Sequence, residues 1–166
     1  MKYCEQTTRG HEINQRTNGA CLSSINEVIE KDDSTKTNLI FERDVIVINL
    51  DEAEKVISRG QQCKPSKSMD ICFGLTNKEF NLSILLVEFR FNYRNMKNLD
   101  KSELDGKLQG SKKLLGESIS IKDEYIFIFQ EGLQQQAKSR LQRMNPRVPS
   151  NYVVMNIYEL KNKYFD

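Results

Sequence analysis

Two segments with an apolar residue at every second position constrain the fold of this chain more than any other feature. The odd-numbered residues from Met69 to Leu75 are all apolar, and so are the odd-numbered residues from Leu85 to Phe91. Because alternate side chains of a β-strand point to opposite faces, each segment predicts a strand with one continuous apolar face. The short stretch between them predicts that the two strands form one hairpin.

The register of this hairpin follows from the apolar faces, because a slip of one residue would turn one of them to the wrong side. One suitable register pairs Ile71 with Val87 and sets Asp70 opposite Glu88, with Cβ atoms about 5 Å apart. A register shifted by two residues sets Asp70 opposite Arg90 instead. In both registers the three charged side chains share one face, at the end of the hairpin away from its turn.

Two carboxylates at this separation repel each other unless a positive charge neutralises them. A divalent cation would neutralise both Asp70 and Glu88, and Mg²⁺ or Mn²⁺ suits oxygen ligands of this kind. The alternative is a structural ion pair between Arg90 and one of the two acids at a strand end.

Length and composition indicate a single domain over residues 1–166. The chain has 166 residues, of which 38% are hydrophobic and 29% charged, enough for one core but not for two separate domains. No apolar run approaches the roughly 20 residues of a membrane helix. Residues 1–6 lack the apolar core of a signal peptide. We therefore expect a cytoplasmic protein without a membrane partner.

The numbers and spacing of cysteine and histidine residues argue against several classes of catalytic or metal site. The four cysteines have irregular spacing without a Cys-x-x-Cys pair, which argues against a zinc knuckle or a redox motif and favours reduced thiols, with Cys72 in the core. His11 is the only histidine, and it lies in a polar segment. Zinc hydrolases and catalytic triads ordinarily need histidine, so neither class is favoured.

Basic residues outnumber acidic ones between Arg90 and Arg147, although the net charge of the chain is only +2. A locally basic surface is compatible with a polyanion such as DNA, but taken alone it is more often an ordinary solvated surface.

The remaining pattern predicts the order of elements. Residues 1–20 are polar and aperiodic, which predicts a loose arm or an irregular lead-in. The elements expected after it are a helix over 22–31, a doubly buried strand over 45–48, a short helix over 51–58, the hairpin, a helix over 101–115, a doubly buried strand over 125–129, a helix over 133–144 and a strand over 152–157. A strand, a helix and another buried strand predict a right-handed parallel crossover.

The helix over 101–115 contains two glycines and two lysines of interest. Gly106 and Gly110 each cost about 1 kcal/mol relative to alanine, which close packing against the sheet would offset. Lys107 and Lys112 flank its apolar stripe on opposite edges, where they either lean toward the acids or are solvated.

These residues resemble the PD-(D/E)XK, or restriction-endonuclease-like, superfamily. Its αβββαβ core has an acid at the start of the second strand and Glu-x-Lys in the third, which match Asp70, Glu88 and Arg90, with Arg90 in place of the lysine and Met69 in place of the proline. The resemblance spans residues 22–130. It implies an α/β fold with a mixed central sheet flanked by helices, and residues 131–166 would be a C-terminal extension with one more helix and strand.

The resemblance also implies an activity, namely Mg²⁺- or Mn²⁺-dependent cleavage of DNA with Asp70 and Glu88 as metal ligands. Arginine stays protonated and cannot act as a general base, so Arg90 would hold a phosphate or stabilise negative charge. In this superfamily the lysine sometimes lies on the neighbouring helix, which makes Lys107 and Lys112 further catalytic candidates.

Other interpretations remain open from the sequence. Glu30 either adds an outer metal ligand, as an acid in the first helix does in some members of the superfamily, or is an exposed surface acid. The protein is either a nuclease, a catalytically degenerate immunity or regulatory module that binds another protein, or a nucleic-acid-binding protein without chemistry. A homodimer is compatible with all three.

Overall fold

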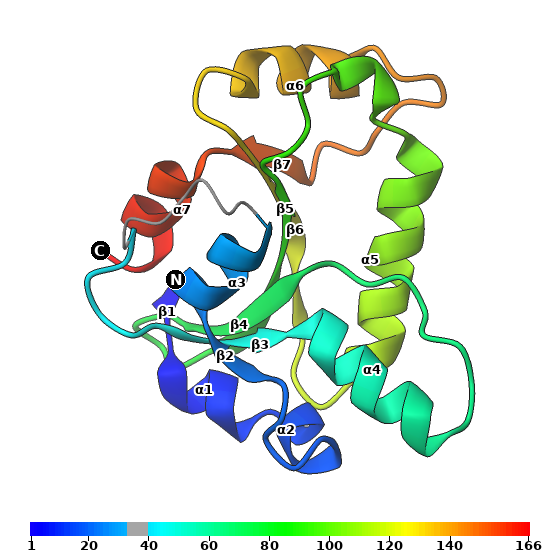
Figure 1. Cartoon of the computed structure of the whole chain (residues 1–166). Helices are drawn as coiled ribbons and strands as arrows, with labels where there is room; N and C mark the ends of the chain where they lie inside the picture. The colour runs from blue at the N-terminus through cyan, green and yellow to red at the C-terminus, as the bar shows by residue number, and fades with distance from the viewer. Residues whose placement is uncertain (33–39) are drawn as a thin grey trace.

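The strands and helices follow each other in an α/β arrangement (Figure 1). The computed structural model describes residues 1–32 and 40–166. The strands are β1 (Lys2–Tyr3), β2 (Leu22–Ser24), β3 (Ile46–Asn49), β4 (Ile71–Thr76), β5 (Leu82–Arg90), β6 (Ile121–Phe129) and β7 (Tyr152–Met155). The helices are α1 (Glu5–Gly10), α2 (Glu12–Arg16), α3 (Ile25–Asp32), α4 (Leu50–Gly60), the short 3-10 helix η1 (Met96–Asn98), α5 (Lys101–Leu115), α6 (Gln134–Gln142) and α7 (Ile157–Tyr164).

The strands form one mixed seven-stranded sheet in the order β2-β3-β4-β5-β6-β7, and β1 also pairs with β4. Pairing is antiparallel from β2 to β5 and parallel from β5 to β7. The predicted hairpin is confirmed, and of its two possible registers the structure has the one that pairs Ile71 with Val87 and Phe73 with Leu85. The predicted parallel crossover is also confirmed, since α5 connects β5 to the parallel strand β6.

Apolar side chains fill both faces of the sheet. The face with Ile71, Phe73 and Val87 packs against α3 and α7, which lie to the left of the sheet in Figure 1. The opposite face, with Cys72 and Leu86, packs against α4, α5 and α6, and α5 lies to the right. The even-numbered positions of β4 and β5 therefore lie on the same face of the sheet as α5.

Residues 1–20 do not form the expected loose arm. Helix α1 packs against β4 at Gly74, where a Cβ atom would lie 2.5 Å from the Cβ atom of Thr7. The hydroxyl of Thr8 accepts a hydrogen bond from the Gly74 amide at 2.9 Å, and Thr7 and Thr8 are buried. His11 is also buried, where its Nδ1 accepts a hydrogen bond from the Ile13 amide. The polar composition of residues 1–20 does not predict packed helices, because threonine and histidine, rather than apolar residues, make the buried contacts.

Three further expectations need correction. The strand predicted over 152–157 ends at Met155, and helix α7 follows it, with Asn156 and Glu159 forming its capping box. Met69 precedes β4 and packs on the α5 side, so the alternation of faces begins only at Ile71. The first predicted helix starts at Ile25, because the three residues before it form β2.

Among the described residues, no helix combines the length and the apolar character needed to cross a bilayer.

Glu124 on β6 ties α7 to the sheet. Its carboxylate forms ion pairs with Lys122 and Lys163 and accepts a hydrogen bond from the Tyr164 hydroxyl at 3.0 Å. Burial alone would raise the pKa of Glu124, but these partners outweigh it and lower the pKa from 4.5 to about 2. The ionised carboxylate therefore stabilises the folded state.

We predict that Glu124→Gln lowers the free energy of unfolding at pH 7 by about 1–2 kcal/mol. Because the folded-state pKa is lowered, this contribution is complete above pH 4.5 and disappears as the pH falls toward about 2. Urea unfolding of wild type and variant at pH 7 and near pH 2 should show a difference that shrinks in acid. Exposed Glu131 provides the control, since Glu131→Gln should change stability at neither pH.

Candidate functional site

Asp70 lies immediately before β4, where the main chain and the neighbouring strand hold it. Its carbonyl accepts a hydrogen bond from the Leu50 amide at 2.9 Å. Its Oδ2 accepts a hydrogen bond from the Phe89 amide at 2.5 Å. Continuing the β4–β5 register by one residue beyond Ile71 sets Asp70 opposite Glu88. The two acids are therefore neighbours at the start of β4 and near the end of β5.

Lys107 extends from α5 to both acids. Its Nζ lies 2.6 Å from Oε1 of Glu88 and 3.8 Å from Oδ1 of Asp70. Three separate parts of the chain thus contribute to one charged site. Of the two lysines of α5 that were named as catalytic candidates, Lys107 is therefore the one that contacts the acids.

Arg90 pairs with the same oxygen of Glu88 as Lys107 does. Its Nε lies 3.1 Å from Oε1 of Glu88, although the two atoms are not aligned as a hydrogen bond. Its Nη2 donates to Oε1 of Glu103 at 2.9 Å, and its guanidinium carbon lies 4.8 Å from the centre of the Tyr93 ring. The Arg90 side chain is 7% exposed, so these contacts hold it inside the protein.

Burial makes the negative charges of this site costly. The Glu88 side chain is 1% exposed and the Asp70 side chain 16% exposed. Burial raises the pKa of Asp70 to about 6, and burial together with the charge of Asp70 raises the pKa of Glu88 to about 8. Burial alone would lower the pKa of Lys107, but the charges of both acids outweigh it and raise the pKa. Two cations therefore compensate the acids only in part.

Asp70 also lines a cavity of about 220 Å³. The other lining residues come from α3, α4 and the nearby strand ends: Val28, Lys31, Asp32, Asn49, Asp51, Glu52, Lys55 and Phe89. Asp70 is thus the member of the acid pair that a small ion or a water molecule reaches from this cavity.

The acid pair fits a hard divalent cation. Within residues 1–32 and 40–166, no group of three or more His, Cys, Asp and Glu side chains is arranged to hold a metal ion. Mg²⁺, however, is commonly held by one or two carboxylates together with water and substrate phosphate. Oε2 of Glu88 is buried and has no hydrogen-bond partner in the described part of the chain. A buried acceptor without a partner is costly, and a cation would satisfy it.

The other candidates lie outside this site. Lys112 places its Nζ 4.9 Å from the centre of the Tyr125 ring. Glu30 is exposed on α3 and does not line the cavity at Asp70, whereas Val28 and Lys31 of the same helix do. Glu103, the second partner of Arg90, was not predicted from the sequence. Its spacing of four residues from Lys107 is a usable signal, because such residues share one face of a helix.

A close contact between α5 and the segment before β4 supports Asp70. The Met69 amide donates to the Ser111 hydroxyl at 2.8 Å. One residue earlier on α5, a Cβ atom at Gly110 would lie 1.8 Å from the carbonyl oxygen of Lys67. Gly110 therefore lets the chain approach α5 just before Asp70. The sequence predicts that close packing against the sheet offsets the cost of a glycine in this helix. Gly110 does pack closely, but against the chain at Lys67 rather than against the sheet.

Comparisons with protein-family models, curated proteins and solved structures found no match to this chain.

The two glycines of α5 provide a matched test of this contact. We predict that Gly110→Ala lowers the free energy of unfolding by about 1–3 kcal/mol, because the backbone at Lys67 must move. Gly106 has open space around its Cβ position, so Gly106→Ala should stabilise the protein by up to about 1 kcal/mol. Urea unfolding of both variants distinguishes the sites, and equal stabilisation by both substitutions would contradict the contact.

Replacing Glu88 tests whether its ion pairs are needed for the stability of the fold or whether the acid serves a function instead. In Glu88→Gln, Lys107 keeps Asp70 and Arg90 keeps Glu103, so two acids still balance two cations. We predict that the free energy of unfolding at pH 7.5 changes by less than about 1 kcal/mol or increases. A loss of about 3–5 kcal/mol, typical of a broken buried ion pair, would contradict this balance.

Asp105 on α5 is the control for this measurement. It forms an ion pair with Lys101 and accepts a hydrogen bond from the Tyr152 hydroxyl at 2.5 Å. Burial would raise the pKa of Asp105, but these partners outweigh it and lower the pKa. Asp105→Asn should therefore destabilise the protein, by about 1 kcal/mol.

Proposed function

We propose that this protein is a Mg²⁺- or Mn²⁺-dependent nuclease of the PD-(D/E)XK type that cleaves DNA. The observation that carries the proposal is the convergence of Asp70, Glu88 and Lys107 from β4, β5 and α5, with Lys107 Nζ 2.6 Å from one acid and 3.8 Å from the other. Two acids and a lysine are the side chains that the resemblance implies. The lysine comes from the neighbouring helix.

The order of elements gives further support. Helix α3, strands β3, β4 and β5, helix α5 and strand β6 follow one another as in an αβββαβ core, with α4 inserted between β3 and β4. The acids stand at the start of the second and near the end of the third of these strands. We propose that this part of the chain is a restriction-endonuclease-like core.

Asp70 and Glu88 would hold the metal ion in this proposal. A bound Mg²⁺ would supply a more acidic water and shield the negative charge of the phosphodiester. Lys107, already beside both carboxylates, would donate hydrogen bonds to the attacking water or to a phosphate oxygen and so orient them for in-line attack. Its positive charge would also stabilise the charge that develops on the phosphate.

Arg90 has a different role here from the one expected for the motif lysine. Because Glu88 and Glu103 hold its guanidinium on the inside of the protein, it orients the Glu88 carboxylate. Arg90 is therefore a positioning residue in the proposed mechanism. Lys107 takes the role of the missing lysine.

One observation favours the second candidate function, a degenerate nuclease fold that binds another protein. Glu88 is almost completely buried, and its Oε1 is ion-paired with both Lys107 and Arg90. A site closed by its own cations would need no metal. In that case the protein would form a tight, metal-independent complex with a protein partner.

Cleavage assays test the proposal directly. We predict that the protein cleaves plasmid or single-stranded DNA with Mn²⁺ and not with EDTA, and that Asp70→Asn and Lys107→Met each reduce the rate roughly 100-fold or more. Lys112→Met is the matched control, because it removes a lysine of the same helix that contacts Tyr125 and should leave the rate unchanged.

Calorimetry separates the two candidate functions. A nuclease should bind Mn²⁺ without DNA, and Glu88→Gln should abolish that binding. Neither DNA cleavage nor Mn²⁺ binding by the wild type, together with a metal-independent protein complex in a pull-down, would favour the degenerate module.

A further inference from the structure

A long segment at the C-terminal side of the sheet carries only positive charge. No acidic residue occurs between Glu131 and Glu159, and the basic residues there are Lys138, Arg140, Arg143 and Arg147. This segment forms α6, the loop that follows it, and the edge strand β7. The four basic residues thus lie on one helix and the adjoining loop. We call the exposed side of α6 and this loop the α6 surface.

Three of these side chains have uncompensated charge. Lys138, Arg143 and Arg147 are exposed, and in the described part of the chain none of them forms an ion pair or donates a side-chain hydrogen bond. On α5, by contrast, Lys101 and Lys107 are paired with acids. The α6 surface therefore keeps its full positive potential.

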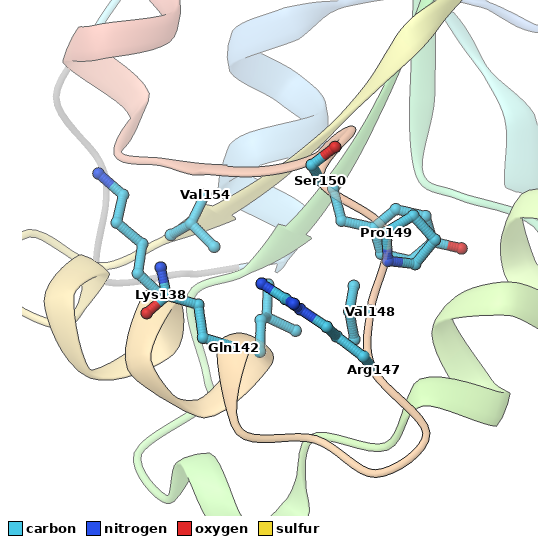
Figure 2. Close-up of a pocket in the computed structure, with 9 residues that line it drawn as sticks. Lys138, Gln142, Arg147, Val148, Pro149, Ser150 and Val154 are labelled. Atoms are coloured by element: carbon cyan, nitrogen blue, oxygen red, sulfur yellow. The ribbon is translucent and has the colours of Figure 1, made fainter.

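The surface is also hollowed. A cavity of about 630 Å³ lies between α6, the loop and β7, and Lys138, Gln142, Arg147, Ser150 and Tyr152 are among its lining residues. Figure 2 shows Lys138 and Gln142 projecting from α6 and Arg147 from the loop. Basic groups from two elements thus border one concavity that is large enough for a phosphate group.

Helix α6 is anchored on the same side of the sheet as the acid site. Ala137 and Leu141 are buried in the core that also contains the apolar side chains of α5. The Arg140 guanidinium donates hydrogen bonds to the carbonyls of Met96 and Leu99, both at 3.2 Å, in the connection between β5 and α5. That connection begins after Arg90, so α6 is fixed beside the chain that leaves the acid site.

The exposed side chains of α6 favour a nucleic acid over a lipid surface. Beside the basic groups they are amides, such as Gln135, Gln136 and Gln142, whereas the apolar residues Ala137 and Leu141 face the core. A helix that binds a bilayer needs an outward apolar face, which α6 lacks. Lysine, arginine and amide side chains are typical ligands of DNA phosphates.

We infer that the α6 surface binds the phosphate backbone of duplex DNA. The choice of DNA rests on the proposed nuclease function, but the binding itself needs neither metal nor cleavage. Lys138, Arg143 and Arg147 each neutralise a phosphate. Arg140 is a positioning residue, since its guanidinium is used to fix the helix.

Fluorescence anisotropy with a labelled duplex, in EDTA so that no cleavage occurs, tests this inference. Each phosphate contact contributes about 0.9 to the slope of log affinity against log salt. The triple variant Lys138→Gln/Arg143→Gln/Arg147→Gln should therefore bind at least about 10-fold more weakly and show a slope smaller by about three between roughly 50 and 200 mM NaCl. Arg143→Lys/Arg147→Lys, which keeps the charge, should bind nearly as well as wild type.

The matched control removes three exposed lysines outside α6, Lys64, Lys78 and Lys113, and should retain wild-type affinity. An equal loss in both triple variants would overturn the inference, and so would binding to vesicles that contain phosphatidylserine in the absence of DNA binding. The outcome is independent of the nuclease proposal. A protein that binds DNA through the α6 surface but never cleaves it would contradict only the proposed activity. If the triple variant of Lys138, Arg143 and Arg147 cleaved DNA at the wild-type rate and bound it with the wild-type affinity, only the inference would be contradicted.

Discussion

The antiparallel pairing of β4 with β5 is the constraint on which the rest of the structure depends. Because Ile71 faces Val87, the odd-numbered side chains of both strands lie on the face of α3 and α7, and the even-numbered ones lie on the face of α5. A slip of one residue would turn Glu88 into the apolar core and Val87 toward Lys107. The same ladder of hydrogen bonds therefore determines both the core and the position of the acids.

The acid site is held by a chain of charges rather than by one ion pair. Glu88 lies between Lys107 and Arg90, and each cation has a second acid, Asp70 or Glu103. Three acids against two cations make the ionised form of Glu88 costly in this buried place, in agreement with the raised pKa of its carboxyl. This imbalance does not stabilise the folded state, and in the proposed function a bound cation would offset it.

Local patterns in the sequence were sufficient for the hairpin, for the face on which its charged residues lie and for the crossover through α5, because alternation and helical period are short-range properties. They left two registers open. They were insufficient for α1 and α2, whose buried contacts are made by polar side chains such as Thr8, and by the absence of a side chain at Gly74. The common face of the two acids could be predicted for the same reason as the hairpin. The sequence named Lys107 and Lys112 together, and it could neither choose between them nor predict Glu103, since Lys107 and Glu103 reach the site only through the packing of α5 on the sheet.

The hydrogen bond between the Phe89 amide and Asp70 restricts how Asp70 can bind anything. Oδ2 takes the place of a main-chain acceptor at the end of the β4–β5 ladder, so rotating it away would leave a buried amide without a partner. Oδ1, the oxygen that faces Lys107, makes no such main-chain hydrogen bond. In the proposed metal site Asp70 would therefore bind chiefly through Oδ1, from a direction that the strand pairing itself determines.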